Sequence, residues 1–276
     1  MRLDRLHLRD GPIDLVIGAE ARAHPAAIAA FDGLLAGLAA ELPALRAPVG
    51  TATLTHPVAR AMAAACLPHG QNFITPMAAV AGAVADHVLA AMVAAVPDMR
   101  RAFVNNGGDI ALHLAPGETL RVGLVADLAR GTPEGAAVIE AADPVRGIAT
   151  SGWPGRSFSL GIADAVTVLA ATAAEADAAA SMIANAVNAD HPAIHRAPAQ
   201  SLDPDSDLGA RLVTVDVGPL PAEVLRAALA AGVAEARGLR DRGLIVAALL
   251  RCQGSAAAVG QISRSAQIAA WSDAAW

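Results

Sequence analysis

An acidic side chain and a hydroxyl group stand four residues apart in an alanine-rich segment, as Asp177 and Ser181. On a helix this spacing places the carboxylate and the hydroxyl one turn apart on the same face. Two hard oxygen atoms on one face suit Mg²⁺, which takes few protein ligands and keeps waters or substrate phosphates. Because the helix dipole also favours an acid near a helix start, a solvent-facing helix start without a ligand is the alternative.

A second set of reactive groups lies in the polar segment 188–209. It holds His191 and His195, followed by the acidic run 203–207. Imidazole titrates near neutral pH, so both histidines are candidates for general acid/base catalysis, beside Asp177 as the third catalytic candidate. The segment is long for a connection between elements, which is typical of a functional loop. Structural histidines in a solvated acidic loop are the alternative.

The third cluster is the run Asn105-Asn106-Gly107-Gly108-Asp109 between two apolar segments. Asn-Gly is the strongest short signal for a hairpin turn, so one interpretation is a simple connector. The other is a binding loop. Two glycines without β-carbons let a ligand approach the backbone N–H groups, and the three polar side chains gather at the rim.

The elements that must position these groups follow from apolar spacing and capping residues. Thr75 with Pro76 is typical of one helix start, and Thr172 of another. The predicted helices are 25–42, 57–67, 76–96, 173–187 and 221–237, and the predicted strands or hairpins are 2–17, 103–114, 121–126, 146–150, 165–169, 211–217 and 244–250. Segments 128–142 and 188–209 are predicted as loops. Because helices and strands alternate irregularly, we predict an α+β fold with antiparallel or mixed sheets packed with helices.

Composition limits the classes of function. The chain has 276 residues, of which 55% are hydrophobic, enough to bury a large core in one unit over 1–276. Two closely packed α+β subdomains are the alternative. All 20 basic residues are arginine, which excludes Schiff-base lysine chemistry and a P-loop lysine.

Charge and apolar patterning limit the partners. A net charge of −6 disfavours nucleic acid. The chain has no long apolar run free of polar breaks, and its N-terminus has no apolar signal core, so we predict a cytoplasmic protein without membrane contact. The alanine-rich, apolar composition favours a homodimer.

Five segments in order along the chain resemble the ApbE-like flavin transferases, and more narrowly a short cytoplasmic branch whose members are mostly uncharacterised. They are a small-residue helix over 78–86, the run 104–110, the turn 149–152, the strand 166–168, and Asp177 with Ser181. The resemblance implies an ApbE-like fold that binds FAD, with magnesium at the diphosphate. In that family FMN is transferred to a Ser or Thr hydroxyl of a target protein and AMP leaves.

The resemblance also implies roles for single residues. Asp177 is expected to be the magnesium carboxylate, Ser181 to replace the threonine of the family, and the backbone carbonyl near Ala78 to complete the metal site. The expected contacts to FAD or FMN are Thr75, Met77, Asn105, Asn106, Gly107, Gly108, Asp109, Ser151 and Gly152.

The sequence departs from the family pattern at two places that concern the transfer step and not the metal site. Ala81 stands where the family carries a lysine, and the segment 153–164 is shorter than the histidine-containing segment of the family. Three hypotheses therefore stay open. The first is a magnesium-dependent FAD-binding enzyme related to FMN transferases. The second is the same fold used for another small-molecule reaction at His191, His195 and the acidic loop. The third is a non-catalytic flavin-binding or accessory protein of a redox system.

Overall fold

The computed structural model describes residues 3–125 and 133–260. They form two compact units, each assembled from separate stretches of the chain. Unit 1 comprises 1–118, 144–149 and 169–179, and unit 2 comprises 119–143, 150–168 and 180–276. Antiparallel strand pairs packed with helices make the fold α+β, as predicted.

The sheet of unit 1 is built from successive antiparallel neighbours. Its strands are β1 (Asp4–Asp10), β2 (Ile13–Ala19), β3 (Arg101–Asn106), β4 (Asp109–Leu114) and the first residues of β7 (Gly147–Ser151). β1 pairs with β2, β2 with β3, β3 with β4, and β4 with β7 at Ile110 and Ile148. Leu15 and Ile17 of β2 are fully buried, so this strand lies in the core.

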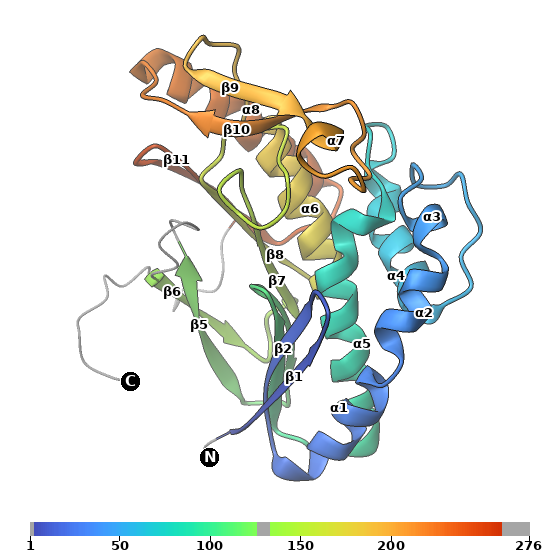
Figure 1. Ribbon diagram of the computed structural model, residues 1–276. Coiled ribbons are helices and arrows are strands. Elements are labelled where there is room, and N and C mark those ends of the chain that lie inside the picture. The colour runs from blue at the N-terminus through green and yellow to red at the C-terminus, as the bar shows by residue number, and fades with distance from the viewer. Residues whose placement is uncertain (1–2, 126–132, 261–276) are drawn as a thin grey trace. The chain divides into compact units, whose positions relative to one another are not determined.

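Helices cover one face of that sheet (Figure 1). They are η1 (Ala21–Ala23), α1 (His24–Phe31), α2 (Leu34–Ala40), α3 (Leu42–Leu45), α4 (Pro57–Cys66), η2 (Leu67–His69), η3 (Pro76–Ala79) and α5 (Val80–Ala95). α5 packs against β3 and β4, and α1 and α4 pack against α5. Val84, Val88 and Met92 of α5 are buried, and their spacing of four residues forms the apolar stripe expected of a core helix.

The predicted single helix over 25–42 is wrong, since the chain forms two short helices there, α1 and α2, and α3 begins at Leu42. The break lies at Gly33, whose φ of +69° is left-handed and ends α1 before α2 begins. Apolar spacing alone continues through this point, whereas the backbone conformation does not.

Unit 2 contains two strand pairs and a hairpin with helices. Its elements are β5 (Thr119–Val125), β6 (Pro133–Glu140), β9 (Ile194–Pro198), α7 (Ala199–Leu202), β10 (Leu212–Val217), α8 (Ala222–Asp241), β11 (Ala247–Cys252) and β12 (Ser255–Val259). α8 packs against β11 and β12. The strands β8 (Ala165–Ala170) and β7 and the helix α6 (Ala173–Ala186) have residues in both units.

Two segments predicted as loops contain regular structure. β6 occupies most of 128–142 and pairs with β5, although 126–132 lies outside the described residues. β9 and α7 lie within 188–209, and β9 pairs with β10. In both cases a partner strand supplies backbone hydrogen bonds that a weakly patterned segment does not reveal by itself.

Two helical segments, Ala21–Ala40 and Pro76–Ala95, are long and apolar enough to cross a membrane. Core helices of water-soluble proteins meet the same criterion. The first segment is divided at Gly33, and the second packs against β3 and β4. The cytoplasmic location and the lack of membrane contact stay predictions.

Candidate functional site

The first turns of α5 and α6 meet within unit 1, and Asp177 lies at their meeting point. Thr172 caps α6 through a hydrogen bond from the Glu175 N–H to its Oγ1 at 3.2 Å, as predicted. Asp177 follows one turn into the helix, and its Oδ2 accepts a hydrogen bond of 3.1 Å from the Gly82 N–H in the first turn of α5. This carboxylate therefore caps α5 from a neighbouring helix.

Burial raises the pKa of Asp177 well above its ordinary range, and the negative charge of Asp109 raises it further. The Gly82 and Ala81 amides lower this pKa and the charge of Asp86 raises it, both by smaller amounts. Two neighbouring carboxyl groups are costly to ionise together, because their negative charges repel. A bound divalent cation would offset that cost, and the oxygen donors present are those that Mg²⁺ prefers.

The described residues contain no cluster of three or more His, Cys, Asp or Glu side chains able to hold a metal ion. A site built from Asp177 must therefore rely on few side chains, on backbone or hydroxyl oxygens, and on waters or ligand phosphates. Magnesium sites in proteins usually have one or two carboxylates together with waters and ligand phosphates.

The run Asn105 to Asp109 forms the β3–β4 hairpin, with Gly107 at φ +65° and Gly108 at φ +116°. The Gly108 N–H donates to Asn105 Oδ1 at 2.9 Å, so this amide is engaged within the turn. A β-carbon at Gly108 would meet no atom within 4 Å, so the turn borders open space. The hairpin interpretation is confirmed, and the binding role of the turn stays a prediction.

Asn106 is a buried residue whose side chain links this hairpin to α5. Its Nδ2 donates to the Ala81 carbonyl at 3.2 Å, and its Oδ1 accepts from the Asp14 N–H at 3.4 Å. The side chain is 6% exposed. These contacts place Asn106 beside the helix start that Asp177 caps, with both ends of its amide bound inside unit 1.

The segment before α5 carries the remaining predicted contacts of unit 1. Thr75 is the buried N-cap residue of η3 and makes no capping hydrogen bond with its side chain. Its carbonyl accepts from the Ala78 N–H at 3.1 Å. Met77 and Ala78 are partly exposed.

The other predicted residues belong to unit 2. Ser181 lies on α6 one turn after Asp177, as the spacing predicts, and Ser151 and Gly152 end β7 and begin the next turn. His191 Nδ1 accepts from the Ala193 N–H at 3.2 Å, which gives the ring a structural role in its turn. His195 is exposed on β9. Their roles as ligands or catalysts stay predictions.

Next to Ser151 and Gly152, unit 2 holds a polar atom without a partner. The Nε1 of Trp153 is buried and has no hydrogen-bond partner among the described residues. Gly152 is required before it, because a β-carbon there would lie 2.5 Å from the Asp164 carbonyl oxygen. A buried indole N–H without an acceptor is costly.

Sequence reasoning missed Asp86 and two glycines. Asp86 of α5 accepts hydrogen bonds from the Ala173 and Ala174 amides at 3.1 and 2.9 Å. A β-carbon on Gly82 would lie 2.2 Å from the Ala173 carbonyl oxygen, and one on Gly147 would lie 2.0 Å from the Thr172 carbonyl carbon. A glycine inside a predicted helix was the available signal for a close approach.

Apo-protein stability is expected to rise as the pH falls through about 6. Burial raises the pKa of Asp86 from 3.8 to about 6, with the Ala174 and Ala173 amides lowering it and Glu175 raising it by lesser amounts. A carboxyl group with a raised pKa in the folded state stabilises the protein below its unfolded-state pKa, and this contribution is lost as the pH rises through the folded value. The contribution is about 3 kcal/mol.

Urea unfolding of the wild type and Asp86→Asn between pH 7.5 and 4.5 measures this effect. The difference in unfolding free energy between them should change with pH in this window, because the variant lacks the titrating group. Parallel curves for the two proteins would contradict the assignment to Asp86.

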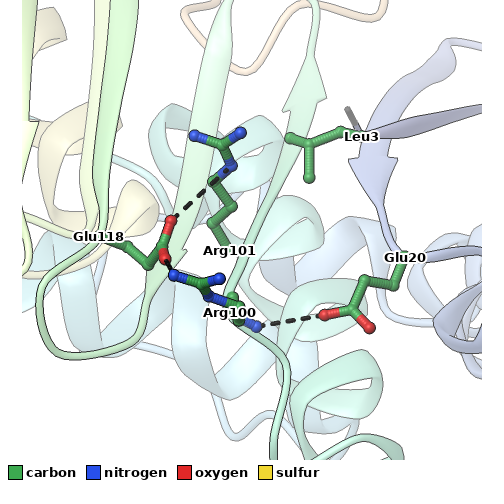
Figure 2. Close-up of a pocket in the computed structure, with 5 residues that line it drawn as sticks. All are labelled: Leu3, Glu20, Arg100, Arg101 and Glu118. Carbon is green, nitrogen blue, oxygen red and sulfur yellow. Dashed lines mark hydrogen bonds and ion pairs between the residues drawn. The ribbon is translucent and has the colours of Figure 1, made fainter. Parts of the chain in front are cut away.

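Figure 2 shows a small hollow in unit 1. It has a volume of about 100 Å³ and is lined by Leu3, Glu20, Arg100, Arg101 and Glu118. Arg100 forms an ion pair with Glu118, and its backbone N–H donates to Glu20 at 3.3 Å. The charges are balanced, and the volume is well below that of an ordinary ligand pocket, so this hollow is not the candidate site.

Comparison with known proteins shows the family and the fold of this chain. The family model described as AbpE bacteria matches residues 1–262. The chain belongs to this family. Its curated relatives include a UPF0280 protein of Methanothrix thermoacetophila, 39% identical over 147 residues, covering 52% of this chain and 58% of the relative. UPF0280 protein MK0206 of Methanopyrus kandleri is 37% identical over 155 residues, covering 55% of this chain and 59% of the relative. The matches thus span less than two thirds of these relatives.

Solved structures show the fold of this AbpE bacteria member. The ApbE protein of Thermotoga maritima has a TM-score of 0.51 at 15% identity, covering 68% of this chain and 88% of the other. The apo flavinyl transferase ApbE of Pseudomonas stutzeri has a TM-score of 0.50 at 12% identity, covering 94% of this chain and 95% of the other. The predicted ApbE-like fold is confirmed, and the UPF0280 relatives fit the uncharacterised branch.

Proposed function

We propose that this protein binds a flavin nucleotide, FAD, with Mg²⁺, and is an enzyme related to FMN transferases. Asp177 would supply the metal carboxylate, Ser181 a hydroxyl, and the chain near Ala78 a backbone carbonyl. A magnesium ion there would neutralise the charge of the diphosphate. The observation that carries this proposal is the Asp177 carboxyl group at the meeting of the α5 and α6 starts, where it accepts from the Gly82 amide. Its own burial and the negative charge of Asp109 raise its pKa there.

One further observation supports a flavin nucleotide as the ligand. The Pseudomonas stutzeri protein of similar fold is a flavinyl transferase. We do not propose FMN transfer for this chain, because Ala81 takes the place of the lysine that the family carries.

The other two hypotheses have less support. His191 accepts a hydrogen bond from the Ala193 amide within its own turn, and His195 is exposed on β9. A non-catalytic flavin-binding protein would share the ligand site, and it differs only in turnover.

Magnesium is expected to strengthen FAD binding about tenfold or more, because the positive metal ion attracts the negative diphosphate. Calorimetric titration of the full chain with FAD, with and without Mg²⁺, measures this coupling. Riboflavin, which lacks the diphosphate, is the matched control ligand, and its affinity should not depend on magnesium. Chromatography of the mixture for AMP and FMN then separates an enzyme from a binding protein.

Each outcome of this titration has a defined meaning. If FAD does not bind in either condition, the flavin proposal is wrong. FAD binding that is equal with and without Mg²⁺ would leave a flavin site but contradict the metal at Asp177. Magnesium-dependent binding without AMP release would favour the accessory protein.

A further inference from the structure

The starts of α5 and α6 are joined by a reciprocal exchange of carboxylates. Asp86 of α5 accepts from the Ala173 and Ala174 amides of α6, through Oδ1 and Oδ2 respectively. In return, Asp177 of α6 accepts from the Gly82 amide of α5. Each helix thus presents a free amide at its start and an acid one turn later, and the two helices satisfy each other.

Asp86 and Thr172 both cap α6, but only Asp86 ties it to α5. Thr172 Oγ1 accepts from the Glu175 N–H within the same helix start. Asp86 uses both carboxylate oxygens on the two preceding amides from a different helix. Loss of Thr172 would therefore weaken the local cap, whereas loss of Asp86 would release the first turn of α6 from α5.

Gly82 allows the backbones of α5 and α6 to approach each other closely. The Ala173 carbonyl oxygen lies 2.2 Å from the place of a β-carbon on Gly82, so the backbones are in direct contact. Asp177 follows Ala173 by one helical turn and moves with it as a rigid unit. A shift of the α6 start away from α5 would carry the Asp177 carboxylate away from the Gly82 amide.

We infer that Asp86 is a positioning residue that holds Asp177 in place for the metal. This inference rests on the proposed function for the identity of the metal, and on the capping contacts alone for the positioning. Asp86 reaches the α6 amides and not the proposed metal, so it acts through the helix start. Residues that orient the protein ligands of a metal typically change metal affinity about 10- to 100-fold.

The test compares Asp86→Asn with Thr172→Ala in the full chain. Asparagine keeps one acceptor oxygen and turns an N–H₂ group toward an amide that needs an acceptor. Two readouts are used, magnesium affinity by calorimetry in the presence of FAD, and amide hydrogen exchange at Gly82 without metal. Asp86→Asn should lower the affinity about 10- to 100-fold and speed exchange at Gly82. Thr172→Ala should leave both near the wild-type values.

Asp86→Glu serves as the conservative variant and keeps two acceptor oxygens. It should fall between the wild type and Asp86→Asn in both readouts, and it carries the comparison with Thr172→Ala if the asparagine variant does not fold. Equal effects of the Asp86 and Thr172 variants would overturn the inference and leave Asp86 as an ordinary cap.

The two proposals fail separately. If wild-type protein does not bind magnesium, the proposed function is wrong, and exchange at Gly82 still decides whether Asp86 positions Asp177. If magnesium binds but Asp86→Asn leaves both affinity and exchange unchanged, the positioning role alone is wrong.

Discussion

Replacing Gly82 by alanine is expected to destabilise the protein by about 3 kcal/mol or more. The added β-carbon would lie 2.2 Å from the carbonyl oxygen of Ala173 and 2.4 Å from its carbonyl carbon. Both atoms belong to backbone at the start of α6, so no side-chain rotation can make room. The midpoint of urea unfolding should fall strongly, and Gly147→Ala should behave similarly because it meets Thr172 in the same way.

Gly238→Ala is the matched control for this substitution. Gly238 is also inside a helix, α8, and a β-carbon there would meet no atom within 4 Å. Since glycine is a poor helix former, alanine at this position should stabilise the protein by about 0.5 to 1 kcal/mol. If Gly82→Ala and Gly238→Ala were equally stable, the close contact between α5 and α6 would not exist in solution.

Replacing Asp177 by alanine is expected to weaken magnesium binding by at least about 100-fold, since even indirect partners of a metal contribute 10- to 100-fold. Magnesium-dependent FAD binding should disappear with it. Asp177→Asn should lose most of the affinity as well, because it keeps an oxygen but removes the negative charge. Calorimetric titration with Mg²⁺ at a fixed FAD concentration measures both variants.

Glu175→Ala tests whether the effect is specific to Asp177. Glu175 lies two residues earlier on the same helix start, and it meets Thr172 through its backbone N–H, which the substitution retains. It removes one negative charge from the same region and should leave the magnesium affinity nearly unchanged. A similar loss in both variants would point to general electrostatic attraction and away from coordination by Asp177.

Local patterns predicted much of the architecture. Capping and turn residues located the α6 start at Thr172 and the hairpin at Asn105 to Asp109, because these features depend on neighbours in sequence. The break at Gly33 was missed, since apolar spacing on both sides of it fits one helix. β6 and β9 were missed because each is stabilised by backbone hydrogen bonds to a partner strand, which its own sequence does not reveal.

The sequence suggested candidate site residues, but it could not predict their contacts. Helical spacing places Asp177 and Ser181 on one face, but the partner of Asp177 is an amide of a distant helix. Asp86 shows no distinguishing pattern in sequence, and its role depends wholly on packing against Ala173 and Ala174. The hydrogen bond from the Gly108 amide to Asn105 is different, because it lies within one turn, and the binding-loop interpretation did not include it.

The exchanged carboxylates also constrain how the chain can fold as it is synthesised. Asp177 follows Gly82 by 95 residues, and Ala173 follows Asp86 by 87. The first turn of α5 therefore lacks its cap until most of the intervening chain has been made, and contacts so far apart in sequence form slowly. The start of α5 therefore stays without its cap during this time. A ribosome-bound chain that stops before residue 173 should have a frayed α5 start.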